Sequence, residues 1–145
     1  MPSKDYAIVP DHICAACGAS DGFVTELRDR AIHYKGHDEV VLAVRARYCN
    51  ACGEGFSMAD SEMQRMAEAV RDFMRSVDAR QATELRATRK RLGLKQAEAA
   101  AIFGGGINAF SEYERGIRQP AKSTVLLLKL LDRHPELLAE VRLAA

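Results

Sequence analysis

The sequence contains no tryptophan, and aromatic residues make up only 6% of its 145 positions. It also lacks an apolar run near the roughly 20 residues that a membrane helix requires, so we expect no transmembrane segment and no membrane partner. Its first residues show no cationic start followed by an apolar stretch, so we expect no secretion signal. We therefore expect a cytoplasmic chain whose four cysteines are thiols or thiolates rather than disulfides.

The length of the chain limits its architecture. A chain of 145 residues can form one domain of ordinary size or two small ones, which excludes barrel enzymes and doubly wound cofactor-binding folds. No carboxylate pair or Cys-His arrangement stands out, and the glycine triplet 104–106 lacks the lysine and hydroxyl residue of a phosphate-binding loop. We therefore expect no catalytic residues and no enzymatic activity.

The net charge of +1 conceals an asymmetry along the chain. Residues 1–79 contain 9 Lys and Arg against 13 Asp and Glu, a net charge of −4, whereas residues 80–145 contain 12 against 7, a net charge of +5. This difference predicts two modules with different partners, of which the second is the candidate for binding a polyanion. The segment 76–83 interrupts the apolar pattern and is predicted to join them.

The first module is predicted to contain strands and one helix. Residues 1–12 include two prolines and are expected to form an arm without firm structure. Alternation of apolar and other residues within 23–48 predicts two antiparallel strands, joined by a turn at 36–38. Apolar residues spaced three or four apart over 60–79 predict a helix with one packed face. Two residues are candidates for its N-terminal cap, Asp60 and Ser57.

The second module is predicted to be all-α. Its helical segments are expected at five ranges, 83–92, 95–103, 107–115, 123–133 and 135–143. Glycines and prolines separate them, as is typical of helix ends and first helical turns. The fold class is therefore a two-domain α+β chain, with a small metal-bound β-hairpin domain carrying a helix, followed by a five-helix domain.

All four cysteines lie in the first module, as two C-x-x-C pairs, Cys14 with Cys17 and Cys49 with Cys52. A two-residue gap allows both sulfurs of a tight turn, or knuckle, to face one metal ion, and two knuckles complete a tetrahedron. Four thiolate ligands leave no position for a reactive water. The pattern therefore predicts one structural Zn²⁺ per chain that performs no chemistry.

Other uses of the cysteines fit the sequence less well than a zinc site. A thioredoxin-like redox pair would require a knuckle at the head of a helix in a βαβ unit, and a disulfide conflicts with the expected compartment. An iron–sulfur cluster stays open, without further support. Three histidines lie near enough in sequence to replace a ligand, although solvent-exposed or hairpin-packing roles are favoured for them: His12, His33 and His37.

The second module contains a pattern of helix, tight turn and helix over 95–116. One face of the second helix is apolar and the other carries Asn108, Glu112 and Arg115. The amide of Asn108 could donate to and accept from an adenine edge in the major groove, although it could also only cap its helix. The glycine triplet would supply the bend between the two helices.

Charged residues surround this turn. Those suited to contact DNA phosphates are Lys90, Arg91, Lys95, Arg115, Arg118 and Lys122, although they could also form an ordinary solvated surface. The positive charge of the module favours the phosphate interpretation. Glu114 is expected to be structural, paired with Arg89 on the preceding helix.

Particular residues of the second module resemble a known family. The run 102–116 includes the glycine triplet followed by Asn-Ala-Phe, which is unusual among helix-turn-helix proteins, and similarity continues through 119–120, 123–124 and 134–138. These segments resemble the DNA-binding half of MqsA/YgiT-type antitoxins, a branch of the Xre/Cro-like helix-turn-helix class. The two knuckles resemble that family's zinc-binding N-terminal half, so the resemblance covers roughly residues 12–142.

The resemblance implies a function. Members of the family form homodimers through the C-terminal domain, repress their own operon at palindromic double-stranded DNA operators, and bind a partner toxin through the zinc domain. That toxin is commonly an mRNA-cleaving ribonuclease. Nucleoid association would follow from operator binding, and the alternative function is a stand-alone regulator without a toxin.

The resemblance also assigns residues. By position, the zinc ligands would be Cys14, Cys17, Cys49 and Cys52, and Asn108 would read a base. One departure is Glu112, where a family member carries arginine; glutamate can only accept, for example from cytosine N4, so the operator is expected to differ. Gln96 and Arg115 are then expected to share the reading with Asn108.

Overall fold

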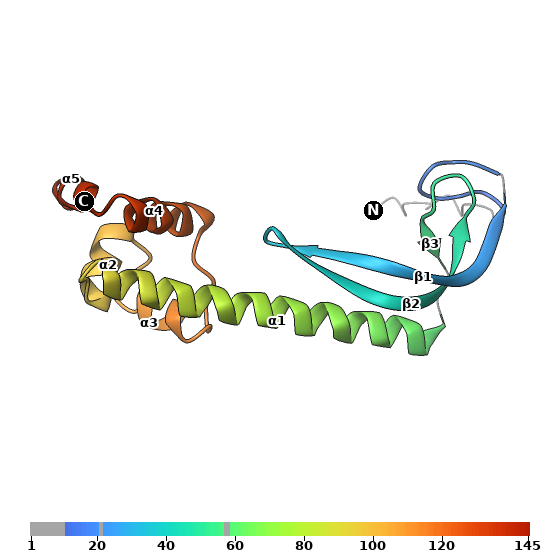
Figure 1. Cartoon of the computed structure of the whole chain (residues 1–145), viewed down its shortest axis with the longest axis horizontal. Helices are drawn as coiled ribbons and strands as arrows, with labels where there is room; N and C mark the ends of the chain where they lie inside the picture. The colour runs from blue at the N-terminus through green and yellow to red at the C-terminus, as the bar shows by residue number, and fades with distance from the viewer. Residues whose placement is uncertain (1–10, 21, 57–58) are drawn as a thin grey trace, which may run out of the picture. The chain divides into compact units, whose positions relative to one another are not determined.

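The computed structural model describes residues 11–20, 22–56 and 59–145 (Figure 1). Most of the arm predicted for residues 1–12 lies outside these ranges, as does Ser57, one of the two predicted cap residues. The chain divides into two compact units, Met1–Phe73 and Met74–Ala145.

The first unit contains an antiparallel sheet in the order β1-β2-β3. Its strands are β1 (Phe23–Tyr34), β2 (His37–Cys49) and β3 (Gly55–Phe56). The predicted pair of antiparallel strands is confirmed, but the turn occupies Lys35 and Gly36, with φ of 51° and 78°, and not 36–38. Two successive positive φ angles are the requirement of a type I′ turn, whose twist matches that of the two strands. The short strand β3 was not predicted.

A β-bulge changes which residues of β2 face the core. The register shifts between Arg28 and Arg30, and Ala43 adopts a φ of 51°. Because a bulge adds one residue to one strand, the alternation of faces reverses across it. Val41 and Val44 are both buried, whereas Leu42 is 64% exposed. The prediction of simple alternation through 40–48 is therefore wrong at this point.

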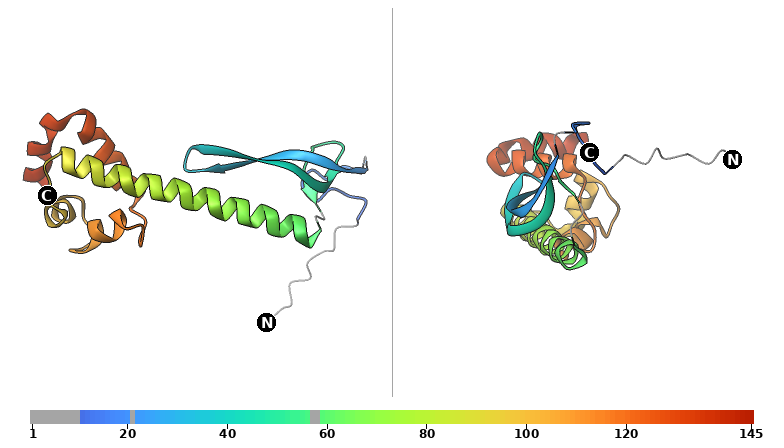
Figure 2. Two further views of the ribbon diagram at one scale, coloured as in Figure 1. Left: turned by 60° about the horizontal axis from the view of Figure 1, so that its bottom comes forward. Right: turned by 90° about the vertical axis from the view of Figure 1, so that its right-hand side faces the viewer.

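Side chains from both sides hold this bulge in place. Asp29 accepts a hydrogen bond from the Ala43 N–H at 2.9 Å. Arg65 donates to the carbonyl oxygens of Leu42 and Ala43, each at 2.9 Å, and is itself paired with Glu62 at 2.8 Å. Arg65 and Glu62 belong to the first turns of α1 (Asp60–Arg91), whose N-terminal part lies beside the hairpin (Figure 2). These contacts attach the helix to the irregular part of the sheet.

The helix α1 is continuous over 32 residues. The prediction of separate helices at 60–79 and 83–92 is therefore wrong, and the segment 76–83, predicted to join the two modules, is helical. The range contains neither glycine nor proline, so nothing local ends the helix when its apolar stripe is interrupted. Acidic residues in its first turn and basic residues in its last turn oppose the helix dipole and stabilise both ends. Asp60 is the first residue of the helix.

The second unit, all of whose residues the structure describes, contains helices and no strand. After the C-terminal part of α1 come α2 (Gln96–Phe103), α3 (Ala109–Glu114), α4 (Lys122–Arg133), a short 3₁₀ turn and α5 (Leu138–Ala144). These elements lie close to the predicted ranges. Their shared core includes Phe110 and Leu131, both at 0% exposure. None of the helices in the described ranges is long and apolar enough to cross a membrane.

Candidate metal centre and nucleic-acid interface

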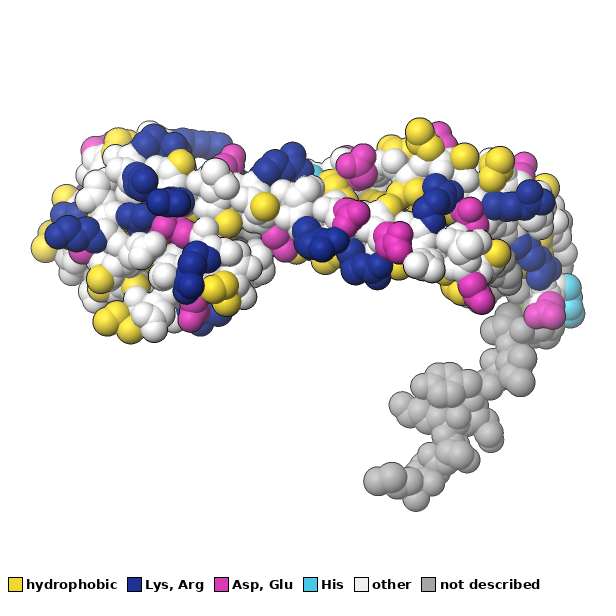
Figure 3. Space-filling model, turned by 90° about the horizontal axis from the view of Figure 1, so that it is seen from below, with side chains coloured by type: hydrophobic (Ala, Val, Ile, Leu, Met, Phe, Trp, Pro, Cys, Tyr) yellow, Lys and Arg dark blue, Asp and Glu magenta, His cyan; other side chains and the backbone are white. Residues whose placement is uncertain are grey.

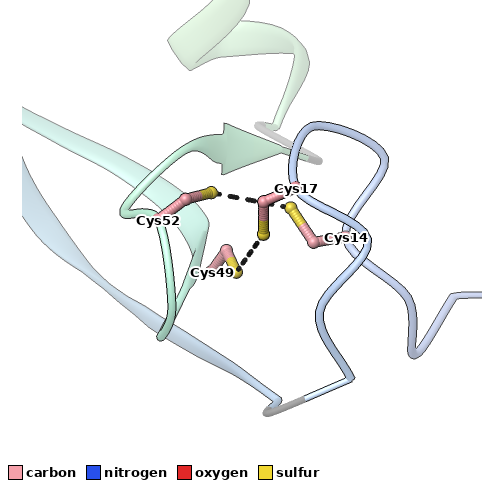
Figure 4. Close-up of side chains that lie close together, drawn as sticks. All are labelled: Cys14, Cys17, Cys49 and Cys52. Atoms are coloured by element: carbon pink, nitrogen blue, oxygen red, sulfur yellow. Dashed lines mark hydrogen bonds between the residues drawn. The ribbon is translucent and has the colours of Figure 1, made fainter.

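Two loops of the first unit bring the four cysteines together (Figure 4). Their sulfur atoms all lie within 4.8 Å of one another. The Sγ atoms of Cys14 and Cys52 are 3.7 Å apart, and those of Cys17 and Cys49 are 3.9 Å apart. A tetrahedral ion with metal–sulfur bonds of about 2.3 Å requires sulfur separations of about 3.8 Å. The four cysteines could therefore hold one metal ion.

The two knuckles share one backbone geometry. In each, the N–H of the first cysteine donates to the carbonyl five residues later, at 2.9 Å in both. The glycine after the second cysteine donates back to the carbonyl of the first, at 2.8 Å from Gly18 and 2.9 Å from Gly53. These glycines adopt φ of 74° and 76°, a left-handed conformation that other residues adopt only with strain. The repeated geometry explains why each C-x-x-C pair is followed by glycine.

The thiols of this cluster do not ionise equally easily, because the pKa values of Cys14 and Cys17 shift in opposite directions. Burial would raise the pKa of Cys14, but backbone N–H groups of its own knuckle, chiefly that of Cys17, lower it to about 7. The Ala19 N–H lowers the pKa of Cys17, but its thiol neighbours, chiefly Cys14 and Cys52, raise it to about 12. Several thiolates so close together repel one another unless a cation lies between them. A divalent metal ion would replace the protons that the cluster otherwise retains.

Residues next to the knuckles were not found by sequence reasoning. Arg30 on β1 pairs with Glu54 at 3.0 Å, directly after the second knuckle, and this hydrogen bond lowers the pKa of the Glu54 carboxyl. Gly55 packs so closely that a Cβ there would lie 2.9 Å from both Arg30 and the Tyr48 ring. Opposite charges far apart in the sequence gave no signal of this pairing.

The histidines that could have replaced a ligand are not members of this cluster. Within the described ranges, the group with metal-ligand geometry consists of the four cysteines and includes no histidine. His33 lies near the hairpin tip, with its Nδ1 2.5 Å from an oxygen of Asp38, and both side chains are exposed. His12 and His37 are exposed as well.

The turn between α2 and α3 fixes the angle of α3. All three glycines of 104–106 have positive φ, and a Cβ at Gly105 would lie 2.7 Å from the Tyr113 hydroxyl and 2.9 Å from the Ala109 Cβ. The rings of Phe103 and Phe110 meet at 5.7 Å and join the two helices. Only glycine therefore allows the turn to approach α3 this closely.

The outer face of α3 carries polar side chains. Asn108 takes the N-cap position, but its side chain makes no capping hydrogen bond. Asn108 and Arg115 are exposed, and Arg115 also donates to the carbonyl of Ser111 at 3.2 Å. Lys and Arg side chains are spread over the face of the second unit seen in Figure 3. The geometry thus leaves the Asn108 amide available to a ligand.

The structure brings together Arg89 and Glu114, which were expected to pair. Arg89 donates to both carboxylate oxygens of Glu114, through Nε and, at 3.0 Å, through Nη2, and it donates to the Leu94 carbonyl at 2.6 Å. The two side chains are only 10% and 4% exposed. Gln96, expected to read a base, donates to the same carboxylate at 2.9 Å. Its amide therefore supports the ion pair.

This buried pair predicts acid sensitivity of the second unit. Burial would raise the pKa of Glu114, but hydrogen bonds from Arg89 and Gln96 hold it below its ordinary value of 4.5. A depressed folded-state pKa stabilises the fold above the unfolded-state pKa, and this stabilisation is lost as the pH falls through the folded value. We expect the melting temperature to decrease as the pH is lowered below about 4.5, and to decrease less steeply in Glu114→Gln. Equal acid slopes in both proteins would contradict this role.

Comparison with known proteins supports one family. Residues 12–142 match the family model described as the antitoxin component of a bacterial toxin-antitoxin system, MqsA. The chain is also 39% identical over 131 residues to Antitoxin MqsA of Escherichia coli (strain K12), an alignment that covers 89% of this chain and 98% of that protein. The chain belongs to the MqsA antitoxin family. The predicted resemblance is therefore confirmed.

In this MqsA-family chain, the other residues predicted to contact DNA are distributed over the second unit. Lys95 precedes α2, and its backbone N–H donates to Glu98 at 2.7 Å. Lys122 is the first residue of α4 and is exposed. Arg118 follows α3 and pairs with Glu112 at 3.0 Å, a contact that the sequence did not predict.

Proposed function

We propose that this chain is an antitoxin with two binding activities. The module 1–79 binds and neutralises a partner toxin, most simply an mRNA-cleaving ribonuclease, and the module 80–145 represses the chain's own operon. The observation that carries this proposal is the family match, which extends over residues 12–142 and so includes both the cysteine cluster and α3. The two binding activities place the protein in the cytoplasm and, when it is bound to an operator, on the nucleoid.

The metal of the first module is proposed to be one structural Zn²⁺. Zinc prefers four thiolates at tetrahedral positions, which the sulfur separations of 3.7 and 3.9 Å fit. All four positions would be taken by Cys14, Cys17, Cys49 and Cys52, so the ion would stabilise the fold without activating water. It would tie the loop before β1 to the turn between β2 and β3.

The second module is proposed to bind double-stranded DNA as an Xre/Cro-like helix-turn-helix domain. Here α2 and α3 are the paired helices, and α3 enters the major groove. Asn108 would contact an adenine edge, since an amide can both donate and accept there. The phosphate contacts would come from basic side chains around the turn, namely Lys95, Arg115 and Lys122.

Dimerisation through the second module completes this proposal. Leu126 and Leu130 of α4 are 55% and 47% exposed, and Leu143 of α5 is 90% exposed. A second copy of the chain would cover these apolar side chains and would present two α3 helices to two half-sites. Such a homodimer matches the symmetry of a palindromic operator.

The toxin can be tested through the neighbouring gene. We expect a small basic protein encoded next to this chain to arrest growth when expressed alone, and growth to resume when the full chain is expressed with it. The two proteins should then purify together. A neighbouring product that is harmless and does not purify with the chain would favour a stand-alone regulator without a toxin.

Replacing Asn108 tests the DNA contact. We expect Asn108→Ala to weaken binding to the duplex upstream of the chain's own coding sequence by about 10-fold or more, because one good base contact is worth about 1–3 kcal/mol. Binding to a scrambled duplex should be unchanged, since phosphate contacts carry no sequence information. Fluorescence anisotropy titrations measure both, and equal losses on the two duplexes would remove Asn108 from base reading.

A further inference from the structure

The side chain of Glu112 is paired, not free, on the outer face of α3. Its Oε2 lies 3.0 Å from Nε of Arg118, a residue that follows the helix in the chain. The same guanidinium donates through Nη2 to the carbonyl of Gly105 at 2.9 Å. It also lies over the ring of Tyr113, 5.0 Å from the ring centroid. Three contacts therefore hold Arg118, two from α3 and one from the glycine turn.

The ion pair brings the guanidinium of Arg118 to the face of α3 on which Glu112 lies. Glu112 lies four residues after Asn108, so the two side chains occupy the same face of α3, one turn apart. By pairing with Glu112, Arg118 places its guanidinium on this face although it lies outside the helix. One turn after Asn108, a duplex would therefore meet a neutral pair that offers guanidinium donors, and not a bare carboxylate.

The contacts also orient the guanidinium. Nε and Nη2 are used by Glu112 and Gly105, whereas Nη1 takes part in neither contact. The Arg118 side chain remains 45% exposed, against 32% for Glu112. A planar guanidinium fixed in this way loses little freedom when it donates to acceptors such as O6 and N7 of guanine. Glutamate has no donor and would repel phosphate.

Resting on the proposed binding of operator DNA, we propose that Arg118 is a specificity-determining residue that reads guanine beside the base contacted by Asn108. Glu112 is its positioning residue and makes no contact with DNA. The glycine triplet then has a second role beyond the bend, because the Gly105 carbonyl fixes the orientation of the reading side chain.

The test is a set of titrations on the duplex upstream of the chain's coding sequence and on its single-base-pair variants. We expect Arg118→Ala to lose about 10- to 100-fold in affinity for the native duplex and to lose preference at one G·C pair only. Arg118→Lys keeps the charge but not the planar fork, so it should lose the same preference while the salt dependence stays nearly unchanged. Arg142→Ala, which removes a charge from α5, is the matched control and should change no base preference.

Glu112→Ala separates positioning from direct reading. If Glu112 acts through Arg118, its removal weakens preference at the same G·C pair, and the double variant with Arg118→Ala is no worse than Arg118→Ala alone. Affinity for a scrambled duplex should rise, since an anion has been removed. Additive losses at two different base pairs would show that Glu112 reads DNA itself and would overturn the proposal.

Two failures can be told apart. A wild-type chain that shows no preference for the native duplex over a scrambled one contradicts the proposed function. If the wild-type chain shows this preference, two results would contradict only the role of Arg118. In one, Arg118→Ala keeps the preference in full; in the other, Arg118→Ala loses affinity equally for all the duplex variants. A uniform loss with a salt slope lower by about 1 would assign Arg118 to a phosphate.

Discussion

Replacing Cys49 with serine is expected to unfold the first unit while the second unit stays folded. Cys49 is 1% exposed and is both a proposed metal ligand and part of the core. The free energy of binding a structural zinc ion, about 10–16 kcal/mol in small domains, equals or exceeds the whole stability of a typical domain. Serine cannot supply a thiolate, so loss of the ion and loss of the fold should occur together.

The variant is best compared with a neutral change in the same turn. Ala51→Ser adds the same hydroxyl to an exposed position between Cys49 and Cys52, and it should keep one metal ion per chain. Metal content by mass spectrometry and amide hydrogen exchange over residues 11–56 measure both effects. A Cys49→Ser protein that retains the ion in full and melts as the wild type does would contradict a structural metal centre. A strong chelator should reproduce the effect of the substitution in the wild-type chain.

The second large effect is expected from the buried ion pair of the second unit. Removing one partner of such a pair leaves an uncompensated buried charge, which costs about 3–5 kcal/mol. In Glu114→Ala, Arg89 would retain only its hydrogen bond to the Leu94 carbonyl, and Gln96 would lose its acceptor. Urea unfolding followed by helical circular dichroism should show this loss. A change below about 1 kcal/mol would mean that water replaces the carboxylate.

Two comparison variants identify the cause. Replacing both partners, as in Arg89→Met with Glu114→Leu, should cost much less than Glu114→Ala alone, because no charge is left buried. Asp132→Ala breaks the pair between Arg91 and Asp132, where the arginine side chain is 57% exposed, and should have a far smaller effect. If all three variants lose similar stability, burial of the pair does not explain its contribution.

The cysteine cluster and the hairpin could be predicted because their signals are local. Two residues between cysteines fix the geometry of a knuckle, and alternation over 23–48 indicates paired strands whatever the rest of the chain does. The bulge at Ala43 could not be predicted, since its positive φ depends on Asp29 and on Arg65 of α1. These contacts join residues that are distant in sequence, and no local preference of alanine indicates them.

Glycines and prolines in the sequence indicated where the helices of the second unit lie. They did not indicate which side chains on those helices pair with one another. Gln96 was predicted to read a base, and in the structure its amide donates a hydrogen bond to Glu114. Glu112 and Arg118 were each assigned to DNA separately, and only the structure shows that they pair. The joint at 76–83 was inferred from a break in the apolar stripe, although a helix without glycine or proline continues through such a break. Side-chain partners depend on the packing of α1, α2 and α3 together.

Amide hydrogen exchange of the full chain, with the duplex upstream of its own coding sequence, tests most directly whether the second unit and not the first binds operator DNA. We expect that duplex to slow exchange in α2, the glycine turn, α3 and the segment up to Gln119, and to leave residues 22–56 unchanged. A scrambled duplex at the same salt concentration should give little protection. No protection of α3, or equal protection by both duplexes, would contradict a second unit that reads operator DNA.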